Sequence, residues 1–459
     1  MLFGSQAFLL LFLPLSLAGY FWLAGHKRAR LGWLTLASFF FYGYWDVRFV
    51  PLLAGSILGN WLLVRAIRPQ QTRWLTLACV SLNLGLLAVF KYADFFASNA
   101  LWLIGETHDP WQLVLPLGIS FFTFEQISYA IDRRNGRAPD YDLLDYAAYV
   151  AFFPHLLAGP IIRHDELIFQ FADDPRRPGW DERAGRGLVL FTLGLIKKVW
   201  LADTFGRDAN RLFDAAAHGS LLGWQDGWHA ALAYTLQLYF DFSAYSDMAI
   251  GLGLMFGLTL PQNFDSPYRA LNIRDFWRRW HMTLSAFLRD YLYIPLGGNR
   301  QAEWRVAATV MVTMLLCGLW HGAGWTFVAW GALHGAAIVV SRGWARWGPR
   351  LPTVAAWLAT MLLVIVGWVL FRAESFAVAG SILRGMGGLS GAGAAVSGED
   401  VRMLALGAVL AIAGPNNMEW ARMRWLPHSA LAAATAVALL AVILRVGAGK
   451  SVEFIYFQF

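Results

Sequence analysis

The sequence is poor in charge. Only 15% of its 459 residues are Asp, Glu, Lys or Arg, whereas an ordinary soluble domain carries about 25%. Hydrophobic residues make up 58% of the chain, and each bilayer crossing needs about 20 mostly apolar residues. This composition argues against a soluble fold and predicts an all-α, polytopic transmembrane protein with on the order of ten crossings.

Cysteine and metal-binding motifs are scarce as well. The two cysteines, Cys79 and Cys317, lie in apolar runs, so we expect neither a disulfide framework nor a zinc site. The sequence has no phosphate-binding P-loop, no His-Glu-x-x-His pair and no Gly-x-Ser-x-Gly nucleophile elbow. The net charge of +7 comes from basic clusters in short connections, which is typical of topology signals rather than of nucleic-acid binding. We therefore expect membrane lipid around the chain, no bound metal or cofactor and no nucleic-acid partner.

The chain has no internal repeat, and we expect one integral membrane domain over residues 1–459. Two apolar runs do not fit one straight crossing. Residues 31–64 are interrupted by Asp46 and Arg48 and are predicted to form a hairpin. Residues 143–162 contain two prolines and a glycine in their centre, which predicts a re-entrant segment that lines a cavity. Two stretches are predicted to be loops outside the membrane: 172–186 and 385–399.

The densest polar region of the chain runs over 263–300. Within it, segment 272–293 is predicted to be an amphipathic helix that lies nearly in the membrane plane and helps to close the cytoplasmic side of a cavity. His281 belongs to this segment. Spacing alone leaves two interpretations open, a polar residue of an interfacial helix or a functional imidazole.

A second candidate, His321, lies within a long apolar run. Apart from the Cys317 thiol, it is the only ionisable side chain between Arg305 and His334. Polar groups at membrane depth are costly and therefore functional by default. Nearby glycines would allow close backbone approach: Gly318, Gly322 and Gly324. The alternative is that His321 only makes a hydrogen bond to a helix carbonyl.

Two carboxylates, Asp241 and Asp247, interrupt the apolar run 228–258. Such groups relay protons, couple an ion, or pair with an arginine, and an arginine of segment 274–289 is a candidate partner. Two histidines without a metal or a nucleophile motif leave general acid/base catalysis on a hydroxyl as the simplest chemistry.

Several segments, spread over nearly the whole chain, carry a resemblance to a known family: 115–121 (LPLGISF), 153–160 (FPHLLAGP), 239–243 (YFDFS), 276–281 (FWRRWH), 319–322 (LWHG) and 456–459 (YFQF). In this order they resemble the membrane-bound O-acyltransferase family. The resemblance is to the branch that contains the enzymes of alginate O-acetylation and, more distantly, of teichoic acid D-alanylation.

The resemblance implies a fold and a site. The fold would be a ring of tilted helices with re-entrant segments around a central tunnel. His321 would be the catalytic histidine, as general base or transient nucleophile, and His281 the second essential histidine, which orients or protonates. The substrate tunnel would include Trp280, Trp320 and Asp241.

The resemblance also implies a function in a bacterial inner (cytoplasmic) membrane, with multiple crossings. Acetyl would pass from a cytoplasmic thioester, acetyl-CoA, to an exported polysaccharide such as alginate, cellulose or peptidoglycan. Because the sequence has no Gly-Asp-Ser motif of a fused esterase-like domain, we expect an extracytoplasmic acetyltransferase or carrier protein as partner. Two alternatives stay open: a proton-coupled transporter of a small acyl or sugar compound, which inverted repeats would favour, and a lipid-linked glycosyltransferase.

Overall fold

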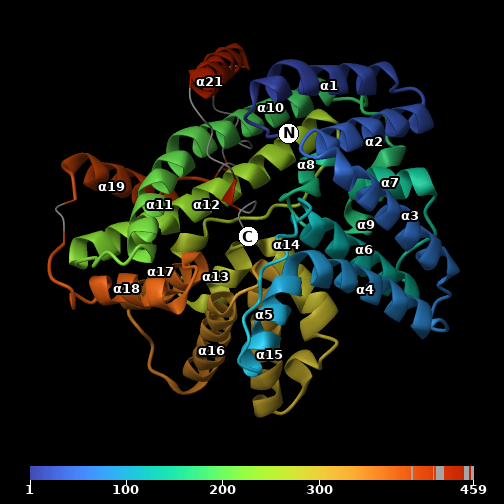
Figure 1. The fold of residues 1–459 in the computed structure, drawn as a ribbon. Helices are drawn as coiled ribbons and strands as arrows, with labels where there is room; N and C mark the ends of the chain where they lie inside the picture. The colour runs from blue at the N-terminus through green and yellow to red at the C-terminus, as the bar shows by residue number, and fades with distance from the viewer. Residues whose placement is uncertain (394–395, 417, 420–427, 449–453, 456–459) are drawn as a thin grey trace. The chain divides into compact units, whose positions relative to one another are not determined.

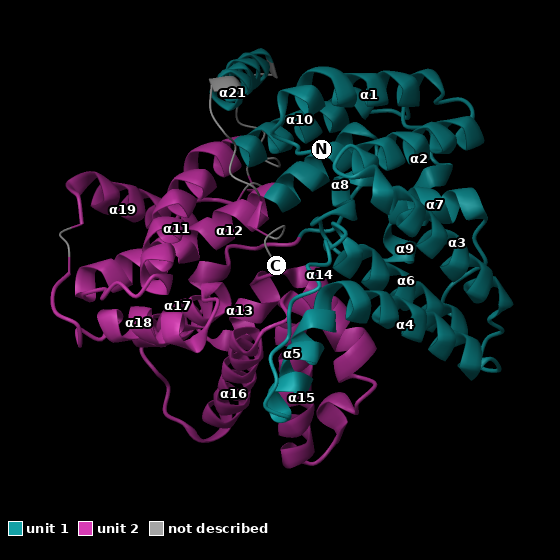
Figure 2. Ribbon diagram, in the orientation of Figure 1, with its two compact units in different colours: residues 1–195, 245–262, 421–450 teal, residues 196–244, 263–420, 451–459 magenta. Residues whose placement is uncertain are grey.

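The computed structural model describes residues 1–393, 396–416, 418–419, 428–448 and 454–455. The segment 456–459, which contributed to the family resemblance, lies outside these residues. All regular secondary structure in the described part is helical (Figure 1), which confirms the predicted all-α class. The chain divides into two compact units (Figure 2): unit 1 comprises 1–195, 245–262 and 421–450, and unit 2 comprises 196–244, 263–420 and 451–459. The expectation of one membrane domain stays a prediction.

Unit 1 contains the N-terminal helices, in which elements close in sequence pack together. Helix α1 packs on α2, α3 on α4, and α4 on α6. The helices of unit 1 are α1 Leu13–Trp22, α2 Lys27–Gly43, α3 Val50–Ala66, α4 Arg73–Leu87, α5 Ala93–Leu103, α6 Ile119–Arg134, α7 Leu143–Ala151, α8 Phe153–Leu156, α9 His164–Leu167, α10 Trp180–Ile196 up to residue 195, and α21 His428–Ala448.

Unit 2 contains the segments that carry both candidate histidines. Its most extensive helix contact joins α15 to α16, and α16 also packs on α17 and α13. The helices of unit 2 are α11 Asp203–Ala217, α13 Ile273–Arg279, α14 Met282–Leu288, α15 Glu303–His321, α16 Trp325–Trp347, α17 Thr353–Arg372, α18 Phe376–Met386 and α19 Gly398–Ile412. Helix α12, Trp224–Met255, contributes its residues up to 244 to unit 2 and the remainder to unit 1.

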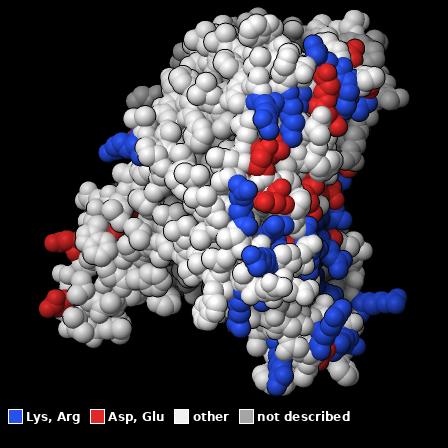
Figure 3. Space-filling view, turned by 90° about the vertical axis from the view of Figure 1, so that its right-hand side faces the viewer, with Lys and Arg blue, Asp and Glu red and all other residues white. Residues whose placement is uncertain are grey.

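Five helical segments in the described part of the chain are long and apolar enough to cross a membrane: Val47–Ala66, Arg73–Leu103, Glu303–His321, Thr353–Arg372 and Ser429–Val446. Two further apolar helices are shorter. The face in Figure 3 has its charged side chains gathered in one band beside a broad area with few of them, as expected where lipid covers apolar side chains. The chain is a multi-pass helical membrane protein. The estimate of about ten crossings is higher than this number because it counted apolar residues without asking whether each run is one unbroken helix.

The predicted interruption of run 31–64 is confirmed. Helix α2 ends at Gly43, and α3 begins at Val50 after a short 3₁₀ turn. Asp46 caps that turn by accepting a hydrogen bond from the backbone N–H of Arg48 (2.9 Å), and the two side chains form an exposed ion pair. A charged pair at a helix break stays hydrated, so it avoids the cost of burying a charge. The run therefore forms two helices rather than one long crossing.

The predicted break in run 143–162 is confirmed too. Helix α7 ends at Ala151, α8 covers only four residues, and irregular backbone follows up to α9. The segment is buried inside unit 1, and His155 Nδ1 lies 2.9 Å from Glu125 Oε1 with both side chains almost fully buried. Gly118 has φ +75° and lies so close to the Leu156 carbonyl that a Cβ there would collide with it. Two segments of the family resemblance thus touch each other, and the re-entrant path stays a prediction.

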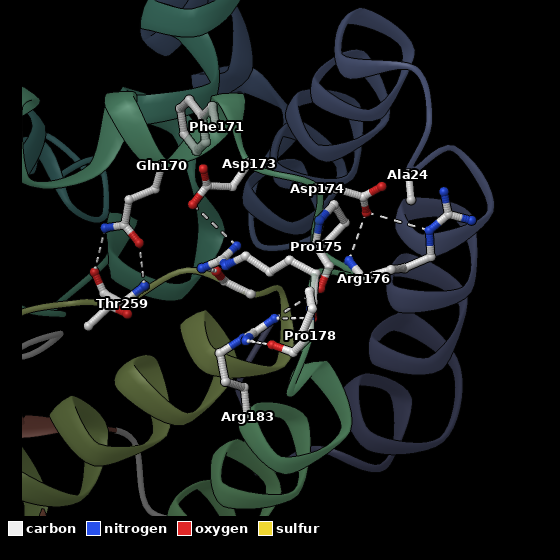
Figure 4. Close-up of polar contacts among 12 residues, drawn as sticks. Ala24, Gln170, Phe171, Asp173, Asp174, Pro175, Arg176, Pro178, Arg183 and Thr259 are labelled. Carbon is white, nitrogen blue, oxygen red and sulfur yellow. Dashed lines mark hydrogen bonds and ion pairs between the residues drawn. The ribbon is translucent and has the colours of Figure 1, made fainter.

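The expected loop 172–186 is wrong in its second half. Residues 173–179 are irregular, but a 3₁₀ turn ends at Ala172 and α10 begins at Trp180. Asp181 and Glu182 lie in the first turn of α10, where negative charge is favourable to the helix dipole. Figure 4 shows the irregular half, in which Arg183 donates to the carbonyl of Pro178 (2.9 Å). The guanidinium groups replace backbone partners that a helix would have supplied. The other expected loop, 385–399, is irregular from 387 to 393 and from 396 to 397.

A buried polar cluster connects three helices of unit 1. Asn83 on α4 donates to Oδ1 of Asn60 on α3 (2.6 Å), and the Cys79 thiol donates to the same oxygen (2.8 Å). Gln126 on α6 donates to Ser56 Oγ (2.9 Å). Polar side chains on apolar helices associate because the alternative is an unsatisfied group in an apolar surrounding. We interpret this cluster as the hydrogen-bonded connection that fixes α3, α4 and α6 relative to one another.

This interpretation predicts that Asn83→Leu destabilises the protein. The change removes the donor to Asn60 and leaves buried amide groups unsatisfied, which costs about 1–3 kcal/mol. We expect a lower melting temperature of the detergent-purified protein than for the wild type. Ser81→Ala, on the exposed side of the same helix, is the matched control and should melt like the wild type. Equal melting temperatures for the two variants would show that the cluster does not stabilise unit 1.

Candidate active site

The position of His321 depends on a close contact between α15 and α16. Helix α15 ends at His321, and α16 begins at Trp325 after a three-residue connection. A Cβ on Gly318 would collide with the Phe327 carbonyl, and one on Gly331 with the Met314 carbonyl. These glycines therefore let the two backbones approach directly, as small residues do between membrane helices. The contact holds the last turn of α15, and His321 with it, against α16.

Aromatic rings surround His321. Its ring centroid lies 4.9 Å from that of Trp320, 5.2 Å from Trp330 and 5.0 Å from Phe371, all in edge-on geometry. These rings come from α15, α16 and α17. The side chain is only 4% exposed. Water is thus largely excluded from the imidazole, and a reaction there would take place in surroundings of low polarity.

His281 lies where the predicted helix 272–293 breaks, and this corrects the prediction of one continuous helix. Helix α13 ends at Arg279, α14 begins at Met282, and His281 between them has the left-handed backbone angles φ +42°, ψ +55°. Such angles are rare for residues other than glycine. Two long-range backbone bonds stabilise the break: Met282 N–H donates to the Asn263 carbonyl, and Asp265 N–H to the Arg279 carbonyl (both 2.9 Å). These tertiary contacts overrode the helical pattern, so the faces expected for segment 272–293 are not formed.

His281 is fully buried among aromatic rings. The ring centroid of Phe242 is 4.7 Å away with the two planes perpendicular, and that of Trp320 is 6.3 Å away. Because burial disfavours the charged form, the pKa of His281 is lowered to about 3. His281 is therefore a neutral imidazole at physiological pH.

The structure brings both predicted catalytic histidines to the same tryptophan. Trp320 is the common neighbour, since its ring centroid lies 6.3 Å from that of His281 and 4.9 Å from that of His321. The two histidines come from segments 40 residues apart, yet both belong to unit 2. Trp280, in contrast, packs into an aromatic core, with ring centroids 4.8 Å from Trp368 and 5.6 Å from Phe276. Its role in a tunnel wall stays a prediction.

Asp241 makes a buried ion pair whose cation was not predicted. Its Oδ1 lies 2.7 Å from the ammonium of Lys198, which also lies 2.8 Å from Asp203. Its Oδ2 accepts a hydrogen bond from the Ile455 backbone N–H (2.7 Å). The prediction that Asp241 pairs with an arginine of segment 274–289 is therefore wrong. Sequence periodicity could not identify Lys198, because the lysine precedes α11 and only the tertiary fold brings it to α12. A tunnel role of Asp241 stays a prediction.

His334 is a further buried imidazole of unit 2, and the sequence analysis did not single it out as a candidate. It lies on α16 and accepts a hydrogen bond at Nδ1 from Trp277 Nε1 (3.3 Å), and its ring is tilted against that of Trp330 with centroids 4.7 Å apart. It is fully buried. The sequence feature that could have identified His334 as a candidate is its position in an apolar run, on the same helix face as Gly331 and Gly335. Among the described residues, no group of three or more His, Cys, Asp or Glu side chains is placed to hold a metal ion.

These features, two buried imidazoles at one tryptophan in an all-helical membrane protein, agree with the family that the sequence resembles. The chain belongs to the membrane-bound O-acyltransferase (MBOAT) family, whose sequence profile matches residues 70–383. The match includes both histidines. The predicted family is thereby confirmed, and the chain is an O-acyltransferase.

Individual relatives agree with this membership. The peptidoglycan O-acetyltransferase of Helicobacter pylori is 43% identical over 429 residues, which cover 85% of this chain and 80% of that relative. The probable alginate O-acetylase AlgI of Pseudomonas aeruginosa is 44% identical over 395 residues, 83% of this chain and 73% of that relative. A more distant relative is the teichoic acid D-alanyltransferase of Streptococcus thermophilus, 29% identical over 241 residues, 50% of this chain and 57% of that relative.

The contact between α15 and α16 predicts that Gly331→Ala impairs both stability and activity. The added methyl group would meet the Met314 carbonyl, and backbone cannot move aside as a flexible side chain can, so the helices must separate. We expect a loss of about 1–3 kcal/mol, seen as a lower melting temperature, together with slower acyl transfer.

Gly343→Ala on the same helix is the control, because a Cβ there meets nothing within 4 Å. It should leave activity unchanged and stabilise α16 by up to about 1 kcal/mol through helix propensity. If both variants behave alike, the close helix contact does not position His321.

Proposed function

We propose that this chain is a membrane O-acetyltransferase that moves acetyl from a cytoplasmic thioester to a hydroxyl, for O-acetylation of an exported polysaccharide. The single observation that carries this proposal is the pair of buried histidines, His281 and His321, at the ring of Trp320 in a chain of the MBOAT family. A neutral imidazole can accept a hydroxyl proton, which is the step that acyl transfer to an alcohol requires.

The acyl group and the class of acceptor follow from the relatives. Those named for O-acetylation are 43% and 44% identical over more than four-fifths of this chain, whereas the D-alanyltransferase is 29% identical over half of it. Acetyl transfer is thus favoured over D-alanyl transfer. The two acetylating relatives are named for peptidoglycan and for alginate, both of them polymers that carry sugar hydroxyls, so the acceptor class is a polysaccharide.

The chemistry can be assigned to the described residues. The hydroxyl oxygen attacks the thioester carbonyl carbon, a C–O bond forms, and the C–S bond breaks. His321 accepts the hydroxyl proton as general base and passes it to the leaving thiolate sulfur, which departs as the thiol. His281 either orients the reacting groups or donates a proton to them, and Trp320 separates the reaction from water. We take acetyl-CoA as the donor, since it is a cytoplasmic acetyl thioester, and we assign the chain no bound cofactor.

The path of the acetyl group is part of the proposal. Donor and acceptor would enter from opposite faces of the membrane through a tunnel within a ring of tilted helices, with Trp280, Trp320 and Asp241 along it. The broken helices α7 and α8 support such irregular paths, because backbone groups freed at membrane depth need partners inside the protein. We place the chain in the inner membrane of a bacterium, as its relatives are bacterial.

The transporter alternative receives no support from the ion pair of Asp241. A proton relay needs a carboxylate that is released in each cycle, but Asp241 is held by Lys198 and by a backbone N–H. Membership in an acyltransferase family favours the enzyme as well.

The proposal predicts that His321→Ala abolishes acetylation of the polymer without loss of the folded protein. Removing a general base typically costs 10²–10⁴-fold in rate, so the acetyl content of the polymer from the variant strain should fall to background. His218→Ala is the matched control, because His218 is exposed at the end of α11 and its Nδ1 lies 2.7 Å from the Asp214 carbonyl, far from the candidate site in the sequence. Acetylation by His321→Ala within about twofold of the control would contradict the assignment.

A second prediction is that the chain needs an extracytoplasmic partner. A hydrated glycan would lose hydrogen bonds to water at a site walled by Trp and Phe, and those walls cannot replace them. A serine or tyrosine hydroxyl of a carrier protein or extracytoplasmic acetyltransferase could enter at lower cost. Purified protein in liposomes with acetyl-CoA and soluble oligosaccharide should therefore release CoA only slowly and leave the sugar unmodified. Efficient acetylation of the oligosaccharide by this chain alone would show that the acceptor enters directly.

A further inference from the structure

Asn263 contacts His281 through both its side chain and its backbone, although 18 positions separate them. Asn263 Oδ1 lies 3.1 Å from His281 Nδ1. The backbone carbonyl of Asn263 accepts a hydrogen bond from Met282, the residue after His281 (2.9 Å). Both Asn263 and His281 are at most 1% exposed, and both belong to unit 2. Asn263 is thus placed to control the orientation of the imidazole.

The hydrogen-bond network identifies which amide atom faces the ring. The same Asn263 atom, Oδ1, lies 3.3 Å from the backbone N–H of Thr283 and 2.9 Å from the Thr283 hydroxyl. A backbone N–H can only donate, so the atom that faces it must be the amide oxygen and not the NH₂ group. A reversed amide would set two donors against each other. The donors of Thr283 therefore identify the atom that faces His281 as the amide oxygen.

The amide oxygen in turn determines the protonation of the ring. Because an oxygen without a hydrogen can only accept, His281 Nδ1 must carry the proton for the 3.1 Å contact to be a hydrogen bond. In a neutral imidazole the other nitrogen, Nε2, then holds a lone pair. His281 Nε2 is buried and has no hydrogen-bond partner among the described residues. It is an acceptor that is available to a ligand.

The backbone around His281 supports a functional reason for this arrangement. The left-handed conformation is unfavourable at a non-glycine residue and persists only where the surroundings enforce it. Here the Asn263–Met282 and Asp265–Arg279 backbone bonds enforce it from both sides. At this break the ring of His281 lies against those of Phe242 and Trp320.

We propose that Asn263 is a positioning residue that holds His281 as the tautomer protonated on Nδ1, so that Nε2 accepts a hydrogen bond from the acceptor hydroxyl. This inference rests on the proposed acetyl transfer and decides between the two roles proposed for His281. His281 orients the acceptor hydroxyl by accepting a hydrogen bond from it, and His281 does not donate a proton to the reacting groups. A hydroxyl has one proton, so the hydrogen bond to Nε2 holds the hydroxyl before reaction. The O–H then turns to His321, which takes the proton as the oxygen attacks the thioester carbon. No covalent bond forms or breaks at His281.

The direct test is nitrogen NMR of the full-length protein labelled with ¹⁵N-histidine in liposomes. The His281 signals are assigned by their disappearance in His281→Gln. We expect a protonated Nδ1 and an unprotonated Nε2 in the wild type, and loss of this single tautomer in Asn263→Ala. A protonated Nε2 in the wild type would overturn the proposal whatever the variants do. This readout needs no acetyl transfer, so it is independent of whether the proposed function holds.

Kinetics provide the second test, with acetyl-CoA as the probe and membranes that contain the partner and the polymer. Asn263→Ala should lower kcat on the order of 10²-fold, as a misoriented reacting group does, with the KM for acetyl-CoA little changed. Asn263→Asp keeps an oxygen acceptor and should keep Nδ1 protonated and restore most of kcat. It is assayed at alkaline pH because a carboxylate favours imidazolium.

Asn210→Ala is the matched control. This change removes another partly buried amide oxygen of unit 2, the Oδ1 that accepts a hydrogen bond from Arg372 (3.1 Å). It should leave kcat unchanged. A kcat for Asn263→Ala equal to that of Asn210→Ala would overturn the positioning role. If Asn263→Ala does not fold, failure of the folded Asn263→Asp to keep Nδ1 protonated would overturn it equally. Loss of activity in Asn263→Ala with an unchanged tautomer would also contradict it.

Discussion

The direct approach of α15 and α16 is the contact on which the arrangement of the candidate site depends. Gly318 and Gly331 each face a backbone carbonyl of the other helix, at a separation that no side chain would allow. Since the contact extends to the last turn of α15, it fixes His321 relative to Trp330 on α16 and Phe371 on α17. The rings of Trp320, Trp330 and Phe371 close around the imidazole and exclude most water from it.

The second constraint is the interruption at His281. Two backbone hydrogen bonds connect the irregular segment around Asn263 to the residues on both sides of the break, and they place an imidazole in a conformation that a helix would not provide. Local strain of this kind is often found at functional sites. It has a clear effect here: the imidazole contacts Phe242 and Trp320 and directs one nitrogen to Asn263. Strain and hydrogen bonding therefore act on the same residue.

Buried polar groups elsewhere in the chain differ from the two histidines in what they contact. Asp241 pairs with Lys198, Glu125 with His155, and Asn60 with Asn83. These pairs lower the cost of burying charge and polarity, and they connect elements within one unit. His281 has one nitrogen bound and the other available. In the proposed role of His281, this available nitrogen binds the acceptor hydroxyl.

The sequence by itself determined the helical membrane class and the family, and it singled out the two histidines as candidates. Long apolar runs in a membrane must pair their backbone groups internally, so they form helices. An imidazole within such a run carries a free-energy cost of burial, and this cost indicates a functional reason for it. It also located the helix breaks at Asp46 and near Pro154, because charged residues and proline act locally.

The sequence could not determine that segment 272–293 breaks at His281, because the bonds that enforce the break come from Asn263 and Asp265. Nor could it find Lys198 beside Asp241, or the tautomer of His281. These features depend on contacts between segments that are distant in the sequence, and such contacts produce no periodic pattern of residues. The tertiary structure alone decided which buried polar groups neutralise each other and that Asn263 lies against His281 Nδ1.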